Sequence, residues 1–456
     1  MDPAEMVHTD PTLTLVGFIV VIALLLLLIT KLKWHVFLAL LLPILLFGLI
    51  PGVNIDNFIE AFEEGFGSTL GGIGVIIVLG CLIGEALKHT GAITTITNGL
   101  INLIGKSRMP LVLTVVGFVL GIAIFSDVAY VILNPIVHSA SAASGMSVGA
   151  MATGLVGSLQ LTHALVPPTP GPIAAAGLIG ADLGMAIIFG AFVCLVGSLA
   201  AWLYGMILGR YIYVPASEEF IGDSFLDSAR TDENEGPSQL NSYAPIAIPV
   251  ILIGAQSISN LVLAEGHTVR IALSYIGWPV IALSVGAWLA YRNVKYPEDK
   301  SKFKNEWVEN ALRTSAMILV VTGLGGSLSN ILEGTPAVEA ISSGVVDAGL
   351  PVIFLPFIIA VIGNMITGST TVGVITAGSL VEPMLADLAL SPEAAFLAAG
   401  SGAVIIKYFN SSYFWVCTSL SRVGANNGLF FYGGATLVAG IVTMATTYLL
   451  WVMGIV

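Results

Sequence analysis

Long apolar runs follow one another along this chain, and they limit its fold more than any other feature. A helix of about 20 apolar residues crosses the hydrocarbon core of a bilayer, and the run at 183–208 contains no charged residue. Of the 456 residues, 56% are hydrophobic and 10% are charged, whereas soluble domains carry about 25% charged residues. The sequence therefore predicts an all-α polytopic membrane protein that lies in a lipid bilayer.

The apolar runs predict about ten full spans, with two long stretches that proline, glycine and polar residues interrupt. The uninterrupted spans are expected at 13–30, 34–50, 68–87, 183–208, 243–263, 271–291, 312–332 and 429–453, and the interrupted stretches at 110–180 and 351–422. The acidic N-terminus lacks the basic region and cleavage site of a signal peptide, so the first apolar run is expected to stay as a helix.

The basic residues indicate an orientation, because they favour cytoplasmic loops. We place the N-terminus outside and give each interrupted stretch a re-entrant hairpin followed by one broken helix that crosses. Nearly all of the 16 basic residues then face the cytoplasm. Arg270 falls outside and Lys407 lies in the membrane. Without the hairpins the alternation fails after Lys88, so the sequence favours a multi-pass protein of the cytoplasmic membrane with two re-entrant hairpins.

The order of spans and interruptions occurs twice, from opposite sides, which predicts an inverted-topology repeat. We expect an N-terminal tail and first span at 1–33, and a first transmembrane repeat at 34–209. An acidic cytoplasmic linker at 210–242 and a linking span at 243–270 lead to the second repeat at 271–456.

Composition and missing motifs exclude several functions. A net charge of −12 argues against nucleic-acid binding. The three cysteines lie inside apolar runs and suit neither zinc nor disulfides, so we expect no metal and no cofactor. The chain lacks a phosphate-binding loop for an ATP-driven pump, and Asp127 lacks a second intramembrane carboxylate for an aspartyl protease. No catalytic residues are expected. An ion channel or a cation/proton antiporter stays open as an alternative of another class.

Polar residues gather at matching interruptions of the two halves. Unwound backbone at membrane depth survives only where it is buried in protein or lines a cavity. Broken helices aim N–H groups at anions, and freed carbonyls and hydroxyls can hold a cation. We therefore expect ion coupling at Ser126, Asp127 and His163, and substrate binding at Thr169, Gly171, Gly368, Ser369, Thr370, Thr371, Lys407, Asn410, Ser411 and Ser412.

These interruptions resemble segments of the gluconate permease family of sugar-acid transporters. The similar segments are PPTPGPIAAAGLIGADLG from Pro167, GSTTVGVITAG from Gly368, FGSTLGGIGVIIVLGCLIGEAL from Phe66, the tip at Asp127 and the run from Asn410 to Trp415. The resemblance implies ion-coupled symport of a small hydroxylated carboxylate such as gluconate, by a protein that is expected to be a homodimer.

This chain departs from the family pattern inside the expected site. Thr169 stands where the family usually has His, and Asn364 where we expect Arg. Near Asn410, Ser411 replaces an Asp and Tyr413 replaces a Gly, while Lys407 is an added basic residue. One basic residue is thus lost near the second tip and another is gained.

The charged and imidazole groups leave alternatives open. A carboxylate at membrane depth usually marks an ion or substrate path, but Asp127 could instead cap a helix. Lys407 could bind the substrate carboxylate, pair with Asp127, replace a cation or snorkel toward water. His163 and His138 could relay protons or simply pack. We favour H⁺ as the coupling ion, because an anion that competes for Lys407 would leave Asp127 unpaired and ready to take up a proton. The alternative is Na⁺ held by Ser126, Asp127 and hairpin carbonyls.

Overall fold

The computed structural model describes residues 34–50, 53–217, 236–332, 349–408 and 411–456, together with scattered positions between 16 and 32. The described residues form helices and no strands. The predicted span 13–30 therefore lies largely outside them, as do most of the linker and Asn410.

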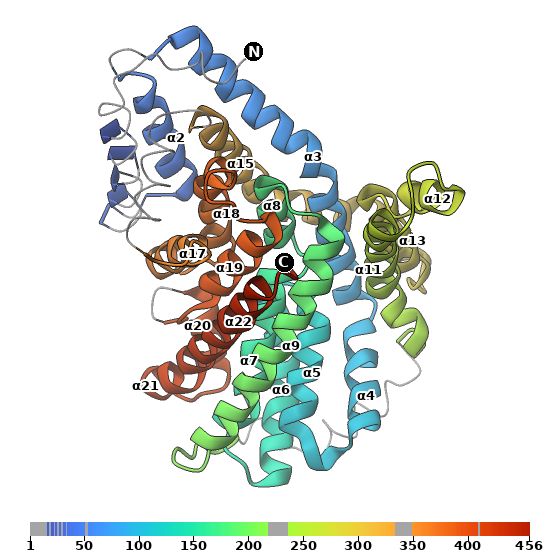
Figure 1. The fold of residues 1–456 in the computed structure, drawn as a ribbon. Helices are drawn as coiled ribbons and strands as arrows, with labels where there is room; N and C mark the ends of the chain where they lie inside the picture. Colours follow the sequence, from blue (N-terminus) through green and yellow to red (C-terminus); the bar gives the residue numbers. More distant parts are fainter. Residues whose placement is uncertain are drawn as a thin grey trace.

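The described residues of the first half form eight α-helices and one short helical turn, and Figure 1 labels the α-helices. They are α2 (Val36–Phe47), α3 (Ile55–His89), α4 (Ala92–Ile104), α5 (Met109–Gly121), α6 (Ser126–Ser144), α7 (Val148–Leu165), α8 (Pro170–Ile179) and α9 (Leu183–Leu208). Polar caps begin several of them: Asn54 Oδ1 accepts from the backbone N–H of Asp56 at 3.0 Å, and Asp182 Oδ1 accepts from that of Met185 at 2.8 Å.

The second half begins after the linker. Its helices are α11 (Gln239–Val262), α12 (Thr268–Ile276), α13 (Pro279–Arg292), α14 (Pro297–Lys302), α15 (Val308–Leu332), α17 (Phe354–Thr367), α18 (Thr370–Val381), α19 (Pro392–Val404), α20 (Ser412–Leu420), α21 (Ala425–Gly428) and α22 (Gly434–Val452). Short helical turns occupy 106–108, 303–307, 382–384 and 429–433, the last of which is η7 (Leu429–Gly433).

Among the described residues, five helices are long and apolar enough to cross a membrane, or up to seven if each bent pair is one span. The predicted span 183–208 coincides with α9, whereas the predicted span 271–291 is split into α12 and α13, which meet at 57° before Pro279. The helix α4 was not predicted; it meets the segment 106–121 at 102°.

Two fully buried helices stand at the centre of the fold. Every residue of α7 is buried, and so is every residue of α19 from Ala394 to Val404. α5 and α9 pack along α7, and α17 and α22 pack along α19. Both central helices end in a break, which begins at Val166 after α7 and at Ile405 after α19, and each break is followed by a shorter helix, α8 or α20.

The two halves exchange partners around these breaks. α8 of the first half packs against α18 of the second, and α20 of the second half packs against α6 of the first. The long helices α3 and α15 also pack together, and so do α9 and α22 (Figure 1). The ends of both central helices are therefore enclosed by helices from both halves.

A candidate functional site between two helix junctions

The junction between α5 and α6 supplies the first group of polar residues. The backbone leaves the helix at 122–125 and re-enters it at Ser126, which is buried. Asp127 lies in the first turn of α6, where the helix dipole favours a negative charge. Its carboxylate is partly buried and makes no hydrogen bond or ion pair with the residues that the structure describes.

The junction between α17 and α18 supplies the second group. Gly368 ends α17 at φ +72°, a conformation that glycine adopts without strain. Ser369 then caps α18, because its Oγ accepts from the backbone N–H of Val372 at 3.3 Å. α17 and α18 fold back on each other, with Gly363 against Gly373: a Cβ on Gly363 would lie 3.1 Å from the Cα of Gly373.

Gln160 of α7 joins the two junctions. Ser126 Oγ donates to Gln160 Oε1 at 3.3 Å, and Gln160 Nε2 donates to Thr370 Oγ1. We did not predict this residue as part of the site, because it lies within an uninterrupted helix. The signal in the sequence was its amide, which stands among apolar and small residues before His163, since polar side chains inside a membrane helix usually face a partner or a cavity.

At the break between α7 and α8, the backbone carbonyls accept hydrogen bonds from a side chain of the break itself. Thr169 is buried, and its Oγ1 lies 2.9 Å from the carbonyl of Val166 and 3.3 Å from that of His163, both of which accept from it. A Cβ on Gly171 would lie 3.2 Å from Thr371 Oγ1, so this glycine lets α8 approach the start of α18.

The side chain of Lys407, in the second break, contacts the α17–α18 junction. This side chain is buried, and its Nζ donates to Asn364 Oδ1 and, at 3.2 Å, to the carbonyl of Gly368. Asn364 Nδ2 in turn donates to the carbonyl of Ile405 at 2.7 Å. The charges of Lys407 and Asp127 are near enough to interact, but the ammonium bonds to the junction rather than to the carboxylate.

A cavity of about 430 Å³ lies between these elements. Of the predicted site residues, Ser126, Asp127, His163, Gly368, Ser369, Thr370, Thr371, Ser411 and Ser412 line it. Thr169, Gly171 and Lys407 are not among the lining residues, and Asn410 lies outside the described residues. Asp127 is the one carboxylate or ammonium on the described wall.

Two buried polar atoms at this cavity lack a hydrogen-bond partner in the described part of the chain: His163 Nδ1 and Ser411 Oγ. The His163 ring packs on Phe125, with 5.2 Å between ring centroids. Buried polar atoms without a protein partner usually bind water or a ligand. Across the described ranges no group of three or more His, Cys, Asp and Glu residues is arranged to hold a metal ion.

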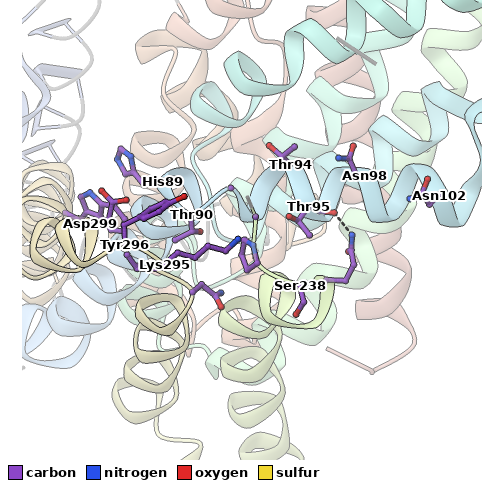
Figure 2. A pocket seen from close by; sticks show the side chains of 17 residues that line it. His89, Thr90, Thr94, Thr95, Asn98, Asn102, Ser238, Lys295, Tyr296 and Asp299 are labelled. Carbon is purple, nitrogen blue, oxygen red and sulfur yellow. Dashed lines mark hydrogen bonds between the residues drawn. The ribbon is translucent and has the colours of Figure 1, made fainter. Parts of the chain in front are cut away.

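A second cavity, of about 670 Å³, is larger but shares no lining residue with the first. Figure 2 shows it along α4, where Thr94, Asn98 and Asn102 follow one helix near Lys295 and Tyr296. Gln239 Nε2 donates to the carbonyl of Thr95 at 2.6 Å there. We take the smaller cavity as the candidate site, because it alone of these two lies where both junctions and the second break meet.

Comparisons with known proteins agree with a membrane permease. The family model described as GntP family permease matches residues 13–453. A gluconate permease of Pseudomonas aeruginosa is 30% identical over 89% of this chain and 89% of its own length. A D-serine transporter of Escherichia coli is 29% identical over 94% of this chain and 96% of its own. The crystal structure of the YdaH transporter of Alcanivorax borkumensis has a similar fold, with a TM-score of 0.63 and 14% identity over 88% of this chain and 90% of that one.

Proposed function

Since this chain belongs to the GntP permease family, we propose that it is a secondary active symporter that carries a small hydroxylated carboxylate, driven by H⁺. Membership of the family makes it a multi-pass membrane transporter and not an enzyme. The substrate class, the binding site and the coupling ion are parts of the proposal.

One observation carries the proposal: three helix N-termini meet at the same cavity. α6 begins at Ser126, α18 at Thr370 and α20 at Ser412, and all three residues line it. Unpaired backbone N–H groups and the helix dipole make such ends suitable for anions. Three such ends around one cavity would repel a cation, which disfavours a cation channel or a cation/proton antiporter as the alternative of another class.

The rest of the cavity wall suits a hydroxylated substrate. Ser369, Thr370, Thr371, Ser412 and Gln160 present hydroxyl and amide groups, and a volume of about 430 Å³ falls in the range of small-molecule sites. The relatives described as gluconate and D-serine transporters are named for carboxylates that carry hydroxyl groups. We therefore propose a substrate of gluconate type, held by its carboxylate at the helix ends and by its hydroxyls at the side chains.

Asp127 links anion binding to proton binding in this proposal. An ionised carboxylate beside the substrate carboxylate costs free energy, because like charges disfavour the charged form. The anion therefore enters together with a proton on Asp127. The alternative is a sodium ion bound by Ser126, Asp127 and the carbonyls of 122–125, which would neutralise the same carboxylate.

We further propose the architecture that transport requires. The α5–α6 and α17–α18 pairs are re-entrant hairpins of an inverted-topology repeat within about ten spans, and the cavity lies at the midplane. The N-terminus faces outward from the cytoplasmic membrane, and the protein forms a homodimer. The exchange of partners between halves supports this arrangement, because α8 with α18 and α20 with α6 are corresponding pairs.

Counterflow in proteoliposomes tests the substrate class. We expect external labelled gluconate to exchange with internal gluconate, and hexanoate, which has a carboxylate but no hydroxyls, to exchange far more slowly. Exchange of an unrelated solute, with no exchange of any hydroxy or sugar acid, would refute the proposed substrate class.

A further inference from the structure

A stripe of polar side chains runs down one face of α6 away from the cavity. Asp127, Tyr130, Asn134, His138 and Ser141 follow one another at steps of three or four residues, which places them on one side of a helix. The last four are buried: Tyr130 and His138 are 0% exposed and Asn134 is 1% exposed. Apolar side chains would form a helix contact in this position at lower desolvation cost.

Polar groups of α20 and η7 face the end of this stripe that is nearer the cavity. α20 packs against α6, and Tyr413 of α20 lines the same cavity as Asp127. The rings of Tyr130 and Tyr432 meet edge to face, with 6.4 Å between centroids. Tyr432 Oη donates to Ser421 Oγ at 2.6 Å, and Ser421 Oγ donates to the carbonyl of Cys417 at 2.5 Å.

Two atoms in the middle of the stripe lack hydrogen-bond partners in the described residues. They are Tyr130 Oη and Asn134 Oδ1, both buried. The free-energy cost of an unsatisfied buried polar atom is about 1–3 kcal/mol, and ordered water usually removes it when the surroundings are polar. Tyr432 and Ser421 add polar groups near Tyr130, so bound water would satisfy the unpaired atoms of the stripe.

The far end of the stripe reaches the chain segment after α9. His138 Nδ1 accepts from the backbone N–H of Ser217 at 3.1 Å, and His138 Nε2 lies 3.0 Å from the carbonyl of Leu420. A nitrogen that accepts leaves the other to donate, so these bonds favour the tautomer with the proton on Nε2. Ser141 Oγ donates to the carbonyl of Met146 at 2.6 Å. In the proposed topology this end faces the cytoplasm.

We propose that this face of α6, from Asp127 past Tyr130 and Asn134 to His138, is a hydrated proton path that connects the cavity with the cytoplasmic end of α6. The inference rests on proton coupling in the proposed function and adds the route by which the proton leaves. The proton of the Asp127 carboxyl passes to a water beside Tyr130 and from water to water past Asn134. One proton leaves the path at the His138 end for each proton that Asp127 gives up. The Asp127 carboxylate then carries its negative charge again.

The charged and titratable neighbours of the path come from four elements. Tyr130 and His138 lie on α6 itself, His163 on α7, Tyr413 and Cys417 on α20, and Tyr432 on η7. The positive charge of Lys407 lies near enough to Asp127 to interact with it. Since Asp127 is the carboxylate among them, it is the group that holds the proton, and Tyr130 and Asn134 are positioning residues for water.

The test measures proton-driven uptake and exchange in the same proteoliposomes, with labelled gluconate and an internal pH dye. Asn134→Leu and Tyr130→Phe remove polar atoms from the path. Both should keep gluconate exchange within about twofold of the unmodified protein and slow gluconate-coupled proton flux about tenfold or more, the usual effect of losing a positioned proton-transfer group. Asn134→Ser, which keeps a polar group and leaves room for water, should restore most of the flux.

Ser198→Ala is the matched control, because Ser198 Oγ is also buried without a partner in the described residues but lies on α9, away from the stripe. Wild-type proton flux in both Asn134→Leu and Tyr130→Phe would overturn the path while leaving proton coupling intact. Equal loss of exchange and flux in Asn134→Leu and Asn134→Ser would assign Asn134 to packing and also overturn it. Gluconate uptake without proton flux in the unmodified protein would refute proton coupling and the path together.

Discussion

Among the described residues, Asp127 and Lys407 are the charged residues at or beside the cavity, and the structure gives them different surroundings. Asp127 lies on the cavity wall, whereas Lys407 is buried behind the α17–α18 junction and bonds to Asn364 and Gly368. We expected the two to meet at the site and to cancel each other's charge. The observed bonds indicate a division instead: Asp127 can exchange a proton with the cavity, and Lys407 stabilises the end of α17, where the dipole favours a positive charge.

The Asp127→Asn variant separates exchange from accumulation. A neutral amide resembles the protonated carboxyl, so the anion can bind without a proton. We predict that gluconate counterflow persists, and that a pH gradient no longer concentrates gluconate inside proteoliposomes. Accumulation at the wild-type level in this variant would show that Asp127 is not the coupling group.

The Lys407→Met variant tests the junction. The substitution leaves Asn364 Oδ1 and the carbonyl of Gly368 without their charged donor, and a hydrogen bond to a charged group is worth about 1.5–3 kcal/mol. We predict that gluconate affinity, measured by thermal shift of the purified protein, falls about tenfold or more. The matched control is Lys88→Met at the exposed end of α3; unchanged affinity in Lys407→Met would contradict a role for this contact in shaping the site.

Several site residues could be predicted from sequence alone because they interrupt apolar runs. Ser126, Asp127, Ser369, Thr370 and Ser412 stand out in this way, and all of them line the cavity. Gln160 could not be identified in this way, because a single amide in the sequence does not show whether its residue lies in a helix or in a break. The direction of the Lys407 side chain could not be predicted either. A break in an apolar run shows which residues leave the helix, but not where their side chains point.

Among the helices, α3 and α15 show how close contact depends on glycine. A Cβ on Gly65 would lie 2.5 Å from the carbonyl oxygen of Gly326, which is backbone and cannot rotate away. Gly67, two residues on, has nothing within 4 Å of its Cβ position. Small residues at membrane helix contacts allow such close approach.

We therefore predict that Gly65→Ala lowers the melting temperature of the purified protein and that Gly67→Ala does not. An overpacked contact typically costs about 1–3 kcal/mol of unfolding free energy. Equal melting temperatures of Gly65→Ala and Gly67→Ala would show that α3 and α15 do not approach as closely as described.

Helix boundaries could be predicted from the sequence only where a change in hydropathy coincides with the end of a helix. The predicted span 183–208 matches α9 because polar residues border it on both sides. The predicted span 68–87 is part of a much longer α3, Ile55–His89, whose first turns carry Asp56, Glu60, Glu63 and Glu64 and therefore lie outside an apolar window. The helix α4 was missed for a similar reason, since its threonines and asparagines reduce its hydropathy.

At the scale of the whole molecule, both halves line the cavity, the second half with more residues than the first, and the halves pair across it. The α5–α6 junction faces the α17–α18 junction through Gln160, and the shorter helices after each break pack on the opposite half. In the proposed repeat, rocking of one half against the other would expose the cavity to each side in turn.

Orientation in the membrane can be measured by labelling with a membrane-impermeant maleimide. The described structure buries Cys81, Cys194 and Cys417, so they should not react. Intact cells should be labelled at Ala264→Cys, which we place outside, and not at Ser107→Cys, which we place in the cytoplasm. The reverse pattern would invert the proposed topology, and labelling of both would reject it.

The central claim, that an anion and a proton move together, is tested most directly by uptake under separately imposed gradients. Proteoliposomes receive labelled gluconate either with an inward proton gradient and equal sodium on both sides, or with an inward sodium gradient at one pH. The account predicts accumulation with the proton gradient and none with the sodium gradient. Accumulation that follows sodium and ignores pH would contradict it.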